Sequence, residues 1–431
     1  MTEERTLTDK LKDRIGQDVS LKGYIDTIRI LGGITFVVLR DRKGTVQVVS
    51  DNPSADLSKL KKYDIVQLKG KVRGENRARS GHEVSAEFFE VLSSPKEQYP
   101  LSVTSKSQEK LETILKYRPI SIRNKKIRDS FVLQQSLAQS FRNYLLSQDF
   151  TEIFTPKIVP QVAESGSDLF HLKYFENDAF LTQSPQFYKQ MLVGSGLERV
   201  FEIGHVYRAE QHNTARHLNE YVSMDLEMGF IDSFSDLMDL EEDMLKYIFG
   251  NVANDYPKIL EEFGVKNPQF KKIPRIPLLE MKEILQSKYR KKFENGKDID
   301  SEGEKLATKY VQEQFGSDLV FLTHYPLENR PFYAMPSENK SLTDSFDLIF
   351  NGLEITTGGQ RIHDYDQLLT SMLNSGINPE NCKGYLMAFK YGMPPHGGMA
   401  IGLERLTMKL LNLQNVREAS LFPRDRTRYS P

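Results

Sequence analysis

The chain has 431 residues, of which 39% are hydrophobic and 27% charged, a composition typical of a globular protein with two or three domains. Its formal net charge of −1 excludes binding to nucleic acid through overall charge, so any such binding must use local patches. The single cysteine, Cys382, excludes a disulfide framework and a cysteine-rich zinc site. Since MTEERTLTDK lacks an apolar signal core and no apolar run approaches the length of a membrane span, we expect a cytoplasmic protein without a membrane partner.

The N-terminal part of the chain has the pattern of short strands. Residues 18–93 alternate between apolar and polar side chains in five segments separated by turn signals such as Asp41-Arg42-Lys43-Gly44. Five such strands in one short stretch predict a small β-barrel of the OB type. Residues 93–100 are rich in serine and proline and are typical of a linker. We therefore expect an OB-type domain over residues 1–95 and a hinge over residues 96–124.

The remainder, residues 125–431, mixes helical and strand-like stretches. FDLIFNGLEITTGG predicts a strand hairpin, and GGMAIGLERLTMKLLNL predicts a glycine-rich strand that runs into a helix. Residues 251–320 are rich in lysine and glutamate and mostly helical in pattern, so we expect an insertion with little catalytic signal. The mixture predicts an α+β domain built on a large antiparallel sheet with flanking helices. The other expected elements are helices at 125–149 and 232–250 and strands at 180–182, 199–207 and 221–230.

A polar connection between two β-prone runs carries the strongest chemical signal. FEIGHVYRAEQHNTARHLNEYVSMDLEMGF, residues 201–230, predicts an antiparallel hairpin with cationic side chains at its loop end. Such cations suit a polyphosphate, because arginine offers phosphate oxygens a rigid fork of donors. A solvated hairpin loop is the alternative. The charged residues are Arg208, Glu210, His212, Arg216 and His217.

Two acidic residues flank a second predicted turn. The chain lacks a P-loop, a Rossmann glycine fingerprint and an H-E-x-x-H motif, so a nucleotide site would be of another kind. Asp347 and Glu354 lie on either side of Asn351-Gly352, and a tight hairpin would turn both carboxylates toward one cleft. Two carboxylates near phosphate-binding arginines suit Mg²⁺, which borrows oxygens from phosphates. Two exposed turn acids are the alternative.

One aromatic residue of the expected barrel has polar and basic neighbours. Phe36 lies in a strand beside Arg29 and Gln47. Aromatic rings on the face of an OB barrel can stack on unpaired bases. A core position is the alternative for Phe36.

Three segments, in the right order, resemble the motifs of a known enzyme class. TEIFTPKI resembles the dimer-forming first motif of the class II aminoacyl-tRNA synthetases, VYRAEQHNTARHLNEY the second, and GGMAIGLERL the third. The likeness extends over nearly the whole chain and is strongest to the aspartyl enzymes of the archaeal and eukaryotic type. It implies a class II antiparallel-sheet catalytic domain and an OB anticodon-binding domain. It also implies a homodimer that uses ATP, Mg²⁺, L-aspartate and tRNA.

The resemblance assigns roles in nucleotide binding. Arg208 resembles the arginine that holds the α-phosphate, and Arg405 the one that closes over the nucleotide from the other side; these are the two expected catalytic residues. Tyr221 occupies the position of the ring that stacks on adenine, and His217 resembles the γ-phosphate contact. The full ATP set is Arg208, Glu210, Arg216, His217, Tyr221, Glu354, Gly402 and Arg405, and the metal set is Asp347, Glu354 and Thr357.

The resemblance also implies an aspartate pocket. Lys189 and Arg361 match the two cations that clamp the side-chain carboxylate, and asparagine would leave such buried cations short of an anion. Asp225 is a suitable partner for the substrate ammonium group, and Glu164 lies in a segment that resembles a loop closing on the amino acid. The implied aspartate set is Glu164, Gln186, Lys189, Arg208, Asp225, Thr357 and Arg361.

In the barrel, four residues resemble those that read the anticodon. Phe36 would stack on a base and Gln47 would bind base edges. Tyr24 stands where many members that charge only the aspartate tRNA have tryptophan, and Ser80 lies in a loop where they have lysine. These departures slightly favour relaxed recognition that includes tRNA(Asn), and they leave the choice open. The implied anticodon set is Arg29, Phe36, Gln47 and Glu87.

Two other functions compete with aspartate–tRNA ligation. An asparaginyl enzyme shares the architecture, but it is expected to lack Lys189. A nucleic-acid-binding paralogue without catalysis would be expected to lose phosphate or metal ligands, whereas Arg208, Glu354 and Arg405 are all present.

Overall fold

The computed structural model describes residues 4–31, 34–50, 55–104, 109–160, 169–211, 213–293 and 298–430. The chain forms two compact units, Met1–Pro100 and Leu101–Pro431. Each unit has its own hydrophobic core. Within the described residues, no helix combines the length and the apolar character that crossing a membrane would require.

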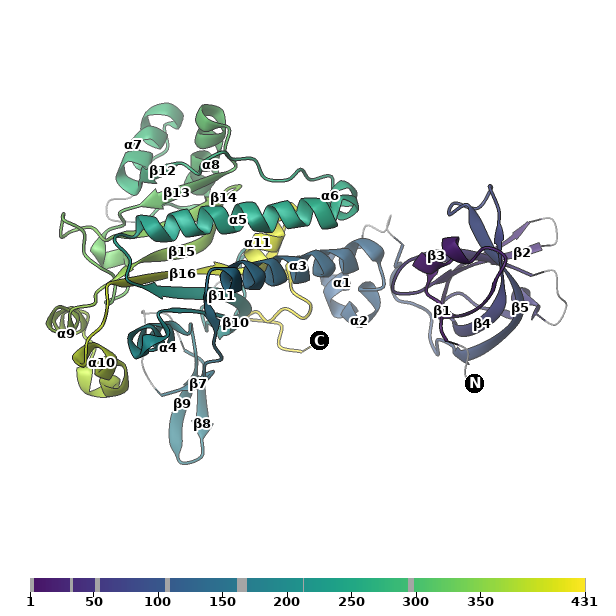
Figure 1. The fold of residues 1–431 in the computed structure, drawn as a ribbon, viewed down its shortest axis with the longest axis horizontal. Coiled ribbons are helices and arrows are strands. Elements are labelled where there is room, and N and C mark those ends of the chain that lie inside the picture. Colours follow the sequence, from purple (N-terminus) through teal and green to yellow (C-terminus); the bar gives the residue numbers. More distant parts are fainter. Residues whose placement is uncertain are drawn as a thin grey trace. The chain divides into compact units, whose positions relative to one another are not determined.

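The first unit is a closed five-stranded barrel, as its alternating pattern predicts (Figure 1). The strand order β1-β2-β3-β5-β4 closes through the β1–β4 pair, so an OB-type barrel is confirmed. Alternate residues such as Val37, Leu39, Val46 and Val48 fill its interior. Its strands and short 3₁₀ helices are β1 (Asp18–Leu31), β2 (Ile34–Arg40), β3 (Thr45–Val49), β4 (Ile65–Gly74), β5 (His82–Ser93), η1 (Thr8–Lys10), η2 (Lys12–Arg14) and η4 (Leu57–Lys59).

The second unit is built on an eight-stranded sheet with the order β12-β13-β14-β15-β16-β11-β10-β6. Its central pairs, from β13 through β10, are all antiparallel, which confirms the predicted sheet. A smaller sheet of β7, β9 and β8 accompanies it. The strands are β6 (Thr151–Glu152), β7 (Ile158–Val159), β8 (His171–Tyr174), β9 (Asn177–Leu181), β10 (Arg199–Tyr207), β11 (Glu220–Gly229), β12 (Arg275–Pro277), β13 (Leu319–Thr323), β14 (Ser345–Phe350), β15 (Leu353–Arg361) and β16 (His396–Gly402).

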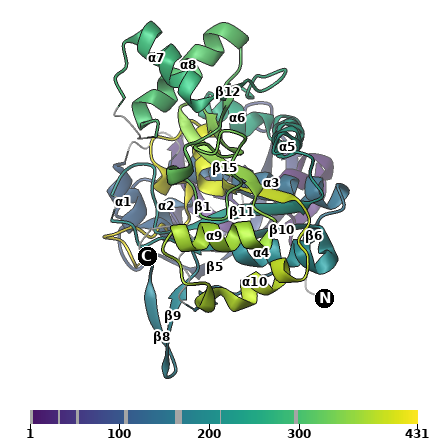
Figure 2. The ribbon, with the colours of Figure 1, turned by 90° about the vertical axis from the view of Figure 1, so that its left-hand side faces the viewer.

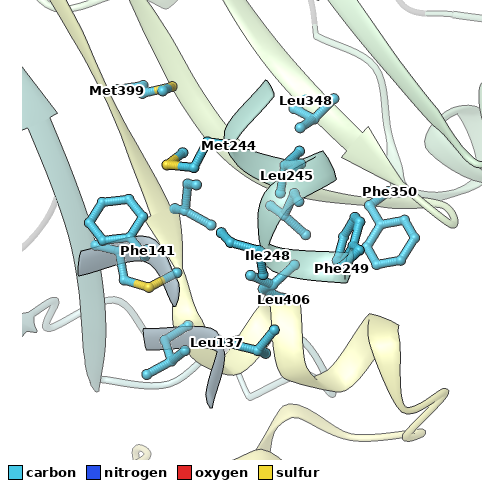
Figure 3. Close-up of a cluster of buried hydrophobic side chains, with 14 of the residues drawn as sticks. Leu137, Phe141, Met244, Leu245, Ile248, Phe249, Leu348, Phe350, Met399 and Leu406 are labelled. Atoms are coloured by element: carbon cyan, nitrogen blue, oxygen red, sulfur yellow. The ribbon is translucent and has the colours of Figure 1, made fainter. Parts of the chain in front are cut away.

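Helices α3 (Lys125–Ser147), α5 (Ser235–Asp255) and α11 (Leu403–Leu410) pack on one face of this sheet. Their apolar side chains interdigitate with those of the strands, as Figure 3 shows for Phe141, Ile248 and Met399. Along β11 the alternate residues Met224, Leu226 and Met228 point into this core. Because strand side chains alternate, the residues between them face the opposite side of the sheet.

Other helices surround the sheet. Figure 2 shows α4, α9 and α10 gathered on one side of the second unit, where they share a separate apolar cluster with Phe332 and Tyr333. The bounds of the remaining helical elements are α1 (Leu111–Lys116), α2 (Arg118–Ser121), α4 (Gln186–Leu192), the π-helical η5 (Val193–Leu197), α6 (Pro257–Phe263), α7 (Leu278–Tyr289), α8 (Ser301–Phe315), η6 (Leu327–Asn329), α9 (Tyr365–Asn374), η7 (Pro379–Cys382), α10 (Lys383–Lys390) and η8 (Val416–Ala419).

Residues 251–320 are mostly helical, as their pattern indicates, since they include α6, α7 and α8. They also contain β12, which pairs in parallel with β13 at the end of the main sheet. The segment therefore extends the sheet as well as adding helices to it.

Candidate active site

A cavity of about 350 Å³ opens at the end of the β10–β11 hairpin, which forms with the antiparallel register expected of it. Its walls come from that hairpin, from β15 and β16 and from α11, elements far apart in the sequence. The predicted nucleotide-binding residues that line it are Arg208, Glu210, Arg216, His217, Tyr221, Glu354, Gly402 and Arg405; Thr357, predicted for the metal and aspartate sets, lines it as well. Every residue of the predicted ATP set therefore borders one cavity.

Arg208 lies directly after β10, and its backbone is fixed at this point. Its N–H donates to the carbonyl of Asn219 at 2.8 Å, and the Asn219 side chain donates back to the carbonyl of Arg208 at 2.6 Å. The guanidinium is 5.8 Å from the centre of the Tyr221 ring and 3.9 Å from the Glu210 carboxylate. The side chain is 44% exposed, so it is held at its base and open toward the cavity.

In the same cavity, Arg405 of α11 contacts Glu354 of β15. Its Nη1 donates to the Glu354 carbonyl at 3.1 Å and to Oε1 at 3.2 Å. Burial alone would raise the pKa of Glu354, but Arg405 and further arginines outweigh it, so the pKa lies below its ordinary value. Glu354 is therefore an anion among cations. A Cβ at Gly402 would meet nothing closer than Arg405 at 3.6 Å, so this glycine leaves the cavity wall open.

The predicted metal set is only partly brought together. Asn351 and Gly352 both have positive φ, 45° and 75°, as the tight hairpin of an Asn-Gly pair requires. The Thr357 hydroxyl is 3.3 Å from Glu354 Oε1 beside the cavity. Asp347 does not line the cavity; it is buried and its Oδ1 is 2.9 Å from Arg330 Nη2. Asp347 is level with Thr357, whereas Glu354 is level with Ile349, and a register shift lies between the two pairs.

Arg216 is held by the helix α8. Its Nη2 donates to Glu304 Oε1 at 2.7 Å, and Nη1 contacts the Ser301 hydroxyl. Burial raises the pKa of Glu304 above its ordinary value, and this effect exceeds the opposing effect of its ion pair with Arg216. Segment 251–320 thus reaches the cavity through α8, a contact that its sequence did not indicate. His217 lies nearby, with Nδ1 2.7 Å from the Thr214 hydroxyl.

A buried charge cluster occupies the same sheet face as the cavity, further along the strands. Lys189 of α4 has Nζ 2.9 Å from Asp225 Oδ1 and 3.5 Å from Glu227 Oε2. Arg361 donates from Nε to Glu227 Oε1 at 3.0 Å and from Nη2 to Gln186 Oε1 at 3.4 Å. None of the five residues is more than 8% exposed.

Strand register explains why the two regions adjoin. Asp225 of β11 is level with Ala400 of β16, which is level with Thr357 of β15. Ala400 and Thr357 line the cavity at the end of the β10–β11 hairpin, which we call the nucleotide-type cavity because the predicted ATP set borders it. The cluster and the cavity therefore meet at this row, and Lys189, Arg208, Arg361 and Arg405 belong to one continuous region.

Glu227 is the most important residue that the sequence-based prediction missed. It has 0% exposure and contacts both Lys189 and Arg361. The period-two spacing from Asp225 on a predicted strand was the available signal, since it places both acids on one face. Its neighbour His396 is also buried; burial lowers the pKa of this ring to about 4, so it is neutral. His396 accepts from Gln190 at 2.8 Å, and Tyr385 donates to the same amide at 3.0 Å.

Gly398 is required for this cluster to pack. A Cβ there would lie 2.0 Å from Glu227 Oε2 and 2.3 Å from the Leu226 carbonyl. We expect Gly398→Ala to displace Glu227 and to lower the free energy of unfolding by about 1–3 kcal/mol, as overpacking does. Chemical denaturation measures this loss. Gly250→Ala is the matched control, because nothing lies within 4 Å of its Cβ and alanine favours its helix; equal stability of both variants would contradict the expectation.

In the barrel unit, three predicted anticodon residues share the outer face. Arg29 and Phe36 are direct partners across β1 and β2, while Val38, on the same face as Phe36, is opposite Gln47. Phe36 is partly buried and lies outside the barrel core, so the alternative of a core position is wrong. Gln47 donates to Glu83 at 2.7 Å, and Arg73 donates to the other oxygen of Glu83 at 2.8 Å. Glu83 is a second residue that the prediction missed.

The remaining predicted residues are placed as follows. Glu87 is exposed and lies at a bulge in β5, where Lys69 pairs with Phe88 and Gly70 with Ala86. Tyr24 is partly buried in β1, and the exposed Ser80 donates to the carbonyl of His82 at 2.8 Å. Glu164, like His212, lies outside the described residues.

Comparison with known proteins agrees with this architecture. Residues 110–426 match the family model of the class II tRNA synthetases (D, K and N), and residues 19–92 match that of the OB-fold nucleic acid binding domain. The sheet, the arginine-lined cavity and the barrel are thus those of a class II tRNA synthetase. The chain belongs to the D, K and N family of that class. Enzymes of this family join amino acids to tRNA at the expense of ATP with a divalent metal.

Two curated relatives and one solved structure illustrate the similarity. The aspartate–tRNA(Asp/Asn) ligase of Aeropyrum pernix is 45% identical over 100% of both chains. The aspartate–tRNA(Asp) ligase of Pyrococcus abyssi is 44% identical over 96% of this chain and 97% of its own. The asparaginyl-tRNA synthetase of Pyrococcus horikoshii complexed with asparaginyl-adenylate has a TM-score of 0.93 at 30% identity over 100% of both chains.

Proposed function

We propose that this protein is an aspartate–tRNA ligase, which activates L-aspartate with ATP and transfers it to the 3′ end of tRNA(Asp). The observation that carries the amino acid assignment is the charge balance of the buried cluster. Lys189 and Arg361 supply two positive charges, and Asp225 and Glu227 supply two negative charges. The cluster is therefore neutral before a substrate arrives.

Aspartate would keep this balance. Its ammonium group would take Asp225 as its partner, which leaves Lys189, Arg361 and Glu227 with one net positive charge for the side-chain carboxylate. Because Glu227 compensates one of the two cations, asparagine would leave one cation of the cluster, not two, without an anion. One buried charge without its partner still costs about 3–5 kcal/mol. This supports aspartate over asparagine, although the asparaginyl enzymes share the fold.

The chemistry then needs no protein nucleophile. An oxygen of the aspartate α-carboxylate attacks the α-phosphorus of ATP, the bond to the β-phosphate bridge breaks, and pyrophosphate leaves. The 3′-terminal ribose hydroxyl of tRNA next attacks the carbonyl carbon of the mixed anhydride, and AMP leaves. Arg208 and Arg405 both line the cavity and would neutralise charge that shifts onto the phosphates.

The other residues of the cavity have roles in the same proposal. Tyr221 would stack on adenine, while His217 and Arg216 would reach the γ-phosphate. Arg216 would have to leave Glu304 to do so, since that carboxylate holds it at 2.7 Å. Glu210 would lie between the nucleotide and the tRNA end.

Mg²⁺ fits the oxygens on this wall. Glu354 is 32% exposed beside the Thr357 hydroxyl, and Mg²⁺ prefers one or two carboxylates completed by phosphate oxygens and water. Among the described residues no group of three or more acidic, histidine or cysteine side chains is placed to hold a metal by itself. We propose that Glu354 and Thr357 hold the ion with ATP, with Asp347 behind them, and that the ion neutralises phosphate charge.

ATP–pyrophosphate exchange tests the amino acid assignment. Exchange should depend on aspartate, and asparagine at the same concentration should support it at least about 100-fold less well. Exchange driven by asparagine, or by neither amino acid, would refute the proposal.

We extend the proposal to a second acceptor, tRNA(Asn). Tyr24 and Ser80 depart from the residues of many aspartate-only members, and the Aeropyrum pernix relative is named for both tRNAs. The Pyrococcus abyssi relative, named for tRNA(Asp) alone, is almost as similar. Aminoacylation of the two purified tRNAs with aspartate decides between strict and relaxed recognition.

The barrel, predicted as residues 1–95, would read the anticodon. Stacking of a base on an aromatic ring is worth roughly 1–3 kcal/mol. We therefore expect Phe36→Ala to raise KM for tRNA by about tenfold while ATP–pyrophosphate exchange stays unchanged. Steady-state charging measures the first quantity, and Val91→Ala, an exposed apolar residue of the barrel, serves as the control. A parallel loss of exchange would show that Phe36 acts on folding instead.

A homodimer completes the proposal. Phe154 in TEIFTPKI is 86% exposed in the single chain, which supports a partner surface at this predicted dimer-forming motif. Sedimentation velocity measures the oligomeric state, and a monomer at micromolar concentration would contradict it.

A further inference from the structure

The C-terminal segment forms one wall of a second cavity in the catalytic unit. This cavity, of about 460 Å³, lies between the β10–β11 connection and the last residues of the chain. Figure 1 shows the yellow C-terminal segment passing beside β10. The side chains that matter here are Glu210, Arg424, Arg426, Arg428 and Tyr429.

This cavity adjoins the nucleotide-type cavity. Glu210 lines both of them. It is 3.9 Å from Arg208, the expected α-phosphate ligand. A chain bound along the C-terminal segment would therefore end where the adenylate forms.

The segment is fixed to the catalytic unit. The Arg424 carbonyl accepts from the Asn219 N–H at 2.9 Å. The backbones of Glu220 and Arg424 form an isolated antiparallel β-bridge. Arg417 donates to the buried carboxylate of Asp425 at 2.6 Å. Asp425 in turn accepts from the N–H of Thr427 at 2.8 Å. Asp425 is thus engaged in fixing the segment, and the arginines project from a fixed backbone.

The exposed side chains fit single-stranded RNA. Arg426 is exposed, and its guanidinium has no ion-pair partner among the residues described. The Tyr429 side chain is 85% exposed. The Arg428 guanidinium pairs with the exposed Glu112 at 2.8 Å, and such an exposed pair contributes little stability. Cations beside an accessible ring are the pattern that binds phosphates and stacks unpaired bases. Glu210 and Glu220 also line the cavity, on the side of the β10–β11 connection.

We propose that Arg424–Tyr429 binds the single-stranded 3′ end of the tRNA and guides it to the adenylate. The inference rests on the proposed function, because that function supplies the RNA and the reaction at Glu210. It assigns tRNA binding to a segment that lies outside the three motifs.

Two variants of the full-length protein test the proposal. We expect Arg426→Ala and Tyr429→Ala each to lower kcat/KM for tRNA charging by about tenfold. ATP–pyrophosphate exchange, which requires no tRNA, should change by less than about twofold. Arg426→Ala should also reduce the slope of log(kcat/KM) against log salt by about one. The controls are Tyr429→Phe, which keeps the ring, and Lys340→Ala, which removes an exposed charge elsewhere in the unit.

An acceptor-stem minihelix without an anticodon separates this wall from the barrel. In both variants, kcat/KM for charging should fall by the same factor with the minihelix as with whole tRNA. Unchanged charging, or an equal loss of exchange, would overturn the inference. Absence of aspartate-dependent exchange in the unaltered protein would refute the proposed function itself, which is a different result.

Discussion

Replacing Arg208 with alanine should abolish adenylate formation and leave the fold intact. Arg208 lines the same cavity as Arg405 and is the cation expected at the α-phosphate. Loss of one preorganised donor at a reacting oxygen costs about 10²–10³ in rate, and loss of a charged fork should cost at least as much. ATP–pyrophosphate exchange should therefore fall by about 10³-fold or more.

The stability of this variant should hardly change. The Arg208 side chain is 44% exposed, and its backbone contacts with Asn219 do not depend on the guanidinium. We expect a free energy of unfolding within about 0.5 kcal/mol of the parent. Arg208→Lys keeps the charge but not the fork and should recover only part of the rate. Lys340→Ala is the charge-matched control, and normal exchange in Arg208→Ala would refute the assignment.

Local patterns were sufficient to predict much of the fold. Asn351-Gly352 between two β-prone runs required a tight hairpin, because such a turn needs two residues with positive φ, and that is what the chain forms. Alternation along 18–93 specified strands with one buried face, which in a segment of five strands can close into a barrel. Turn residues and hydrophobic periodicity depend on residues that are close together in the chain, so they can be recognised in a single sequence.

Contacts between distant segments were not accessible in this way. Arg216 and Glu304 lie 88 residues apart, and no local pattern links the hairpin loop to helix α8. The convergence of Arg208 and Arg405 was expected only from the resemblance of their motifs to a known class. Glu227 is an intermediate case: its face followed from Asp225, but its two cationic partners come from α4 and β15 and are known only from the fold.

Replacing Lys189 with methionine should remove the preference for aspartate. Lys189 has 0% exposure and lies 2.9 Å from Asp225 and 3.5 Å from Glu227. Without it, the pocket keeps Arg361 against two acids, so a substrate carboxylate would enter a site with net negative charge. Aspartate-dependent exchange should fall by about 10²-fold or more, and the ratio of aspartate to asparagine activation should approach one.

The same substitution should also destabilise the protein, and a second change separates the two effects. Breaking a buried pair costs about 3–5 kcal/mol because a charge remains without a partner. Lys189→Met combined with Asp225→Asn removes that charge, so stability should recover in part. Because Asp225 is also the proposed ammonium partner of either amino acid, the readout for Lys189 is the ratio of aspartate to asparagine activation, which should stay near one. Lys157→Met breaks another largely buried pair, with Glu202 at 2.8 Å, outside the pocket, and should cost stability without changing amino acid preference. If the double variant kept the parent's preference for aspartate over asparagine, Lys189 would be a structural residue and the charge argument for aspartate would fail.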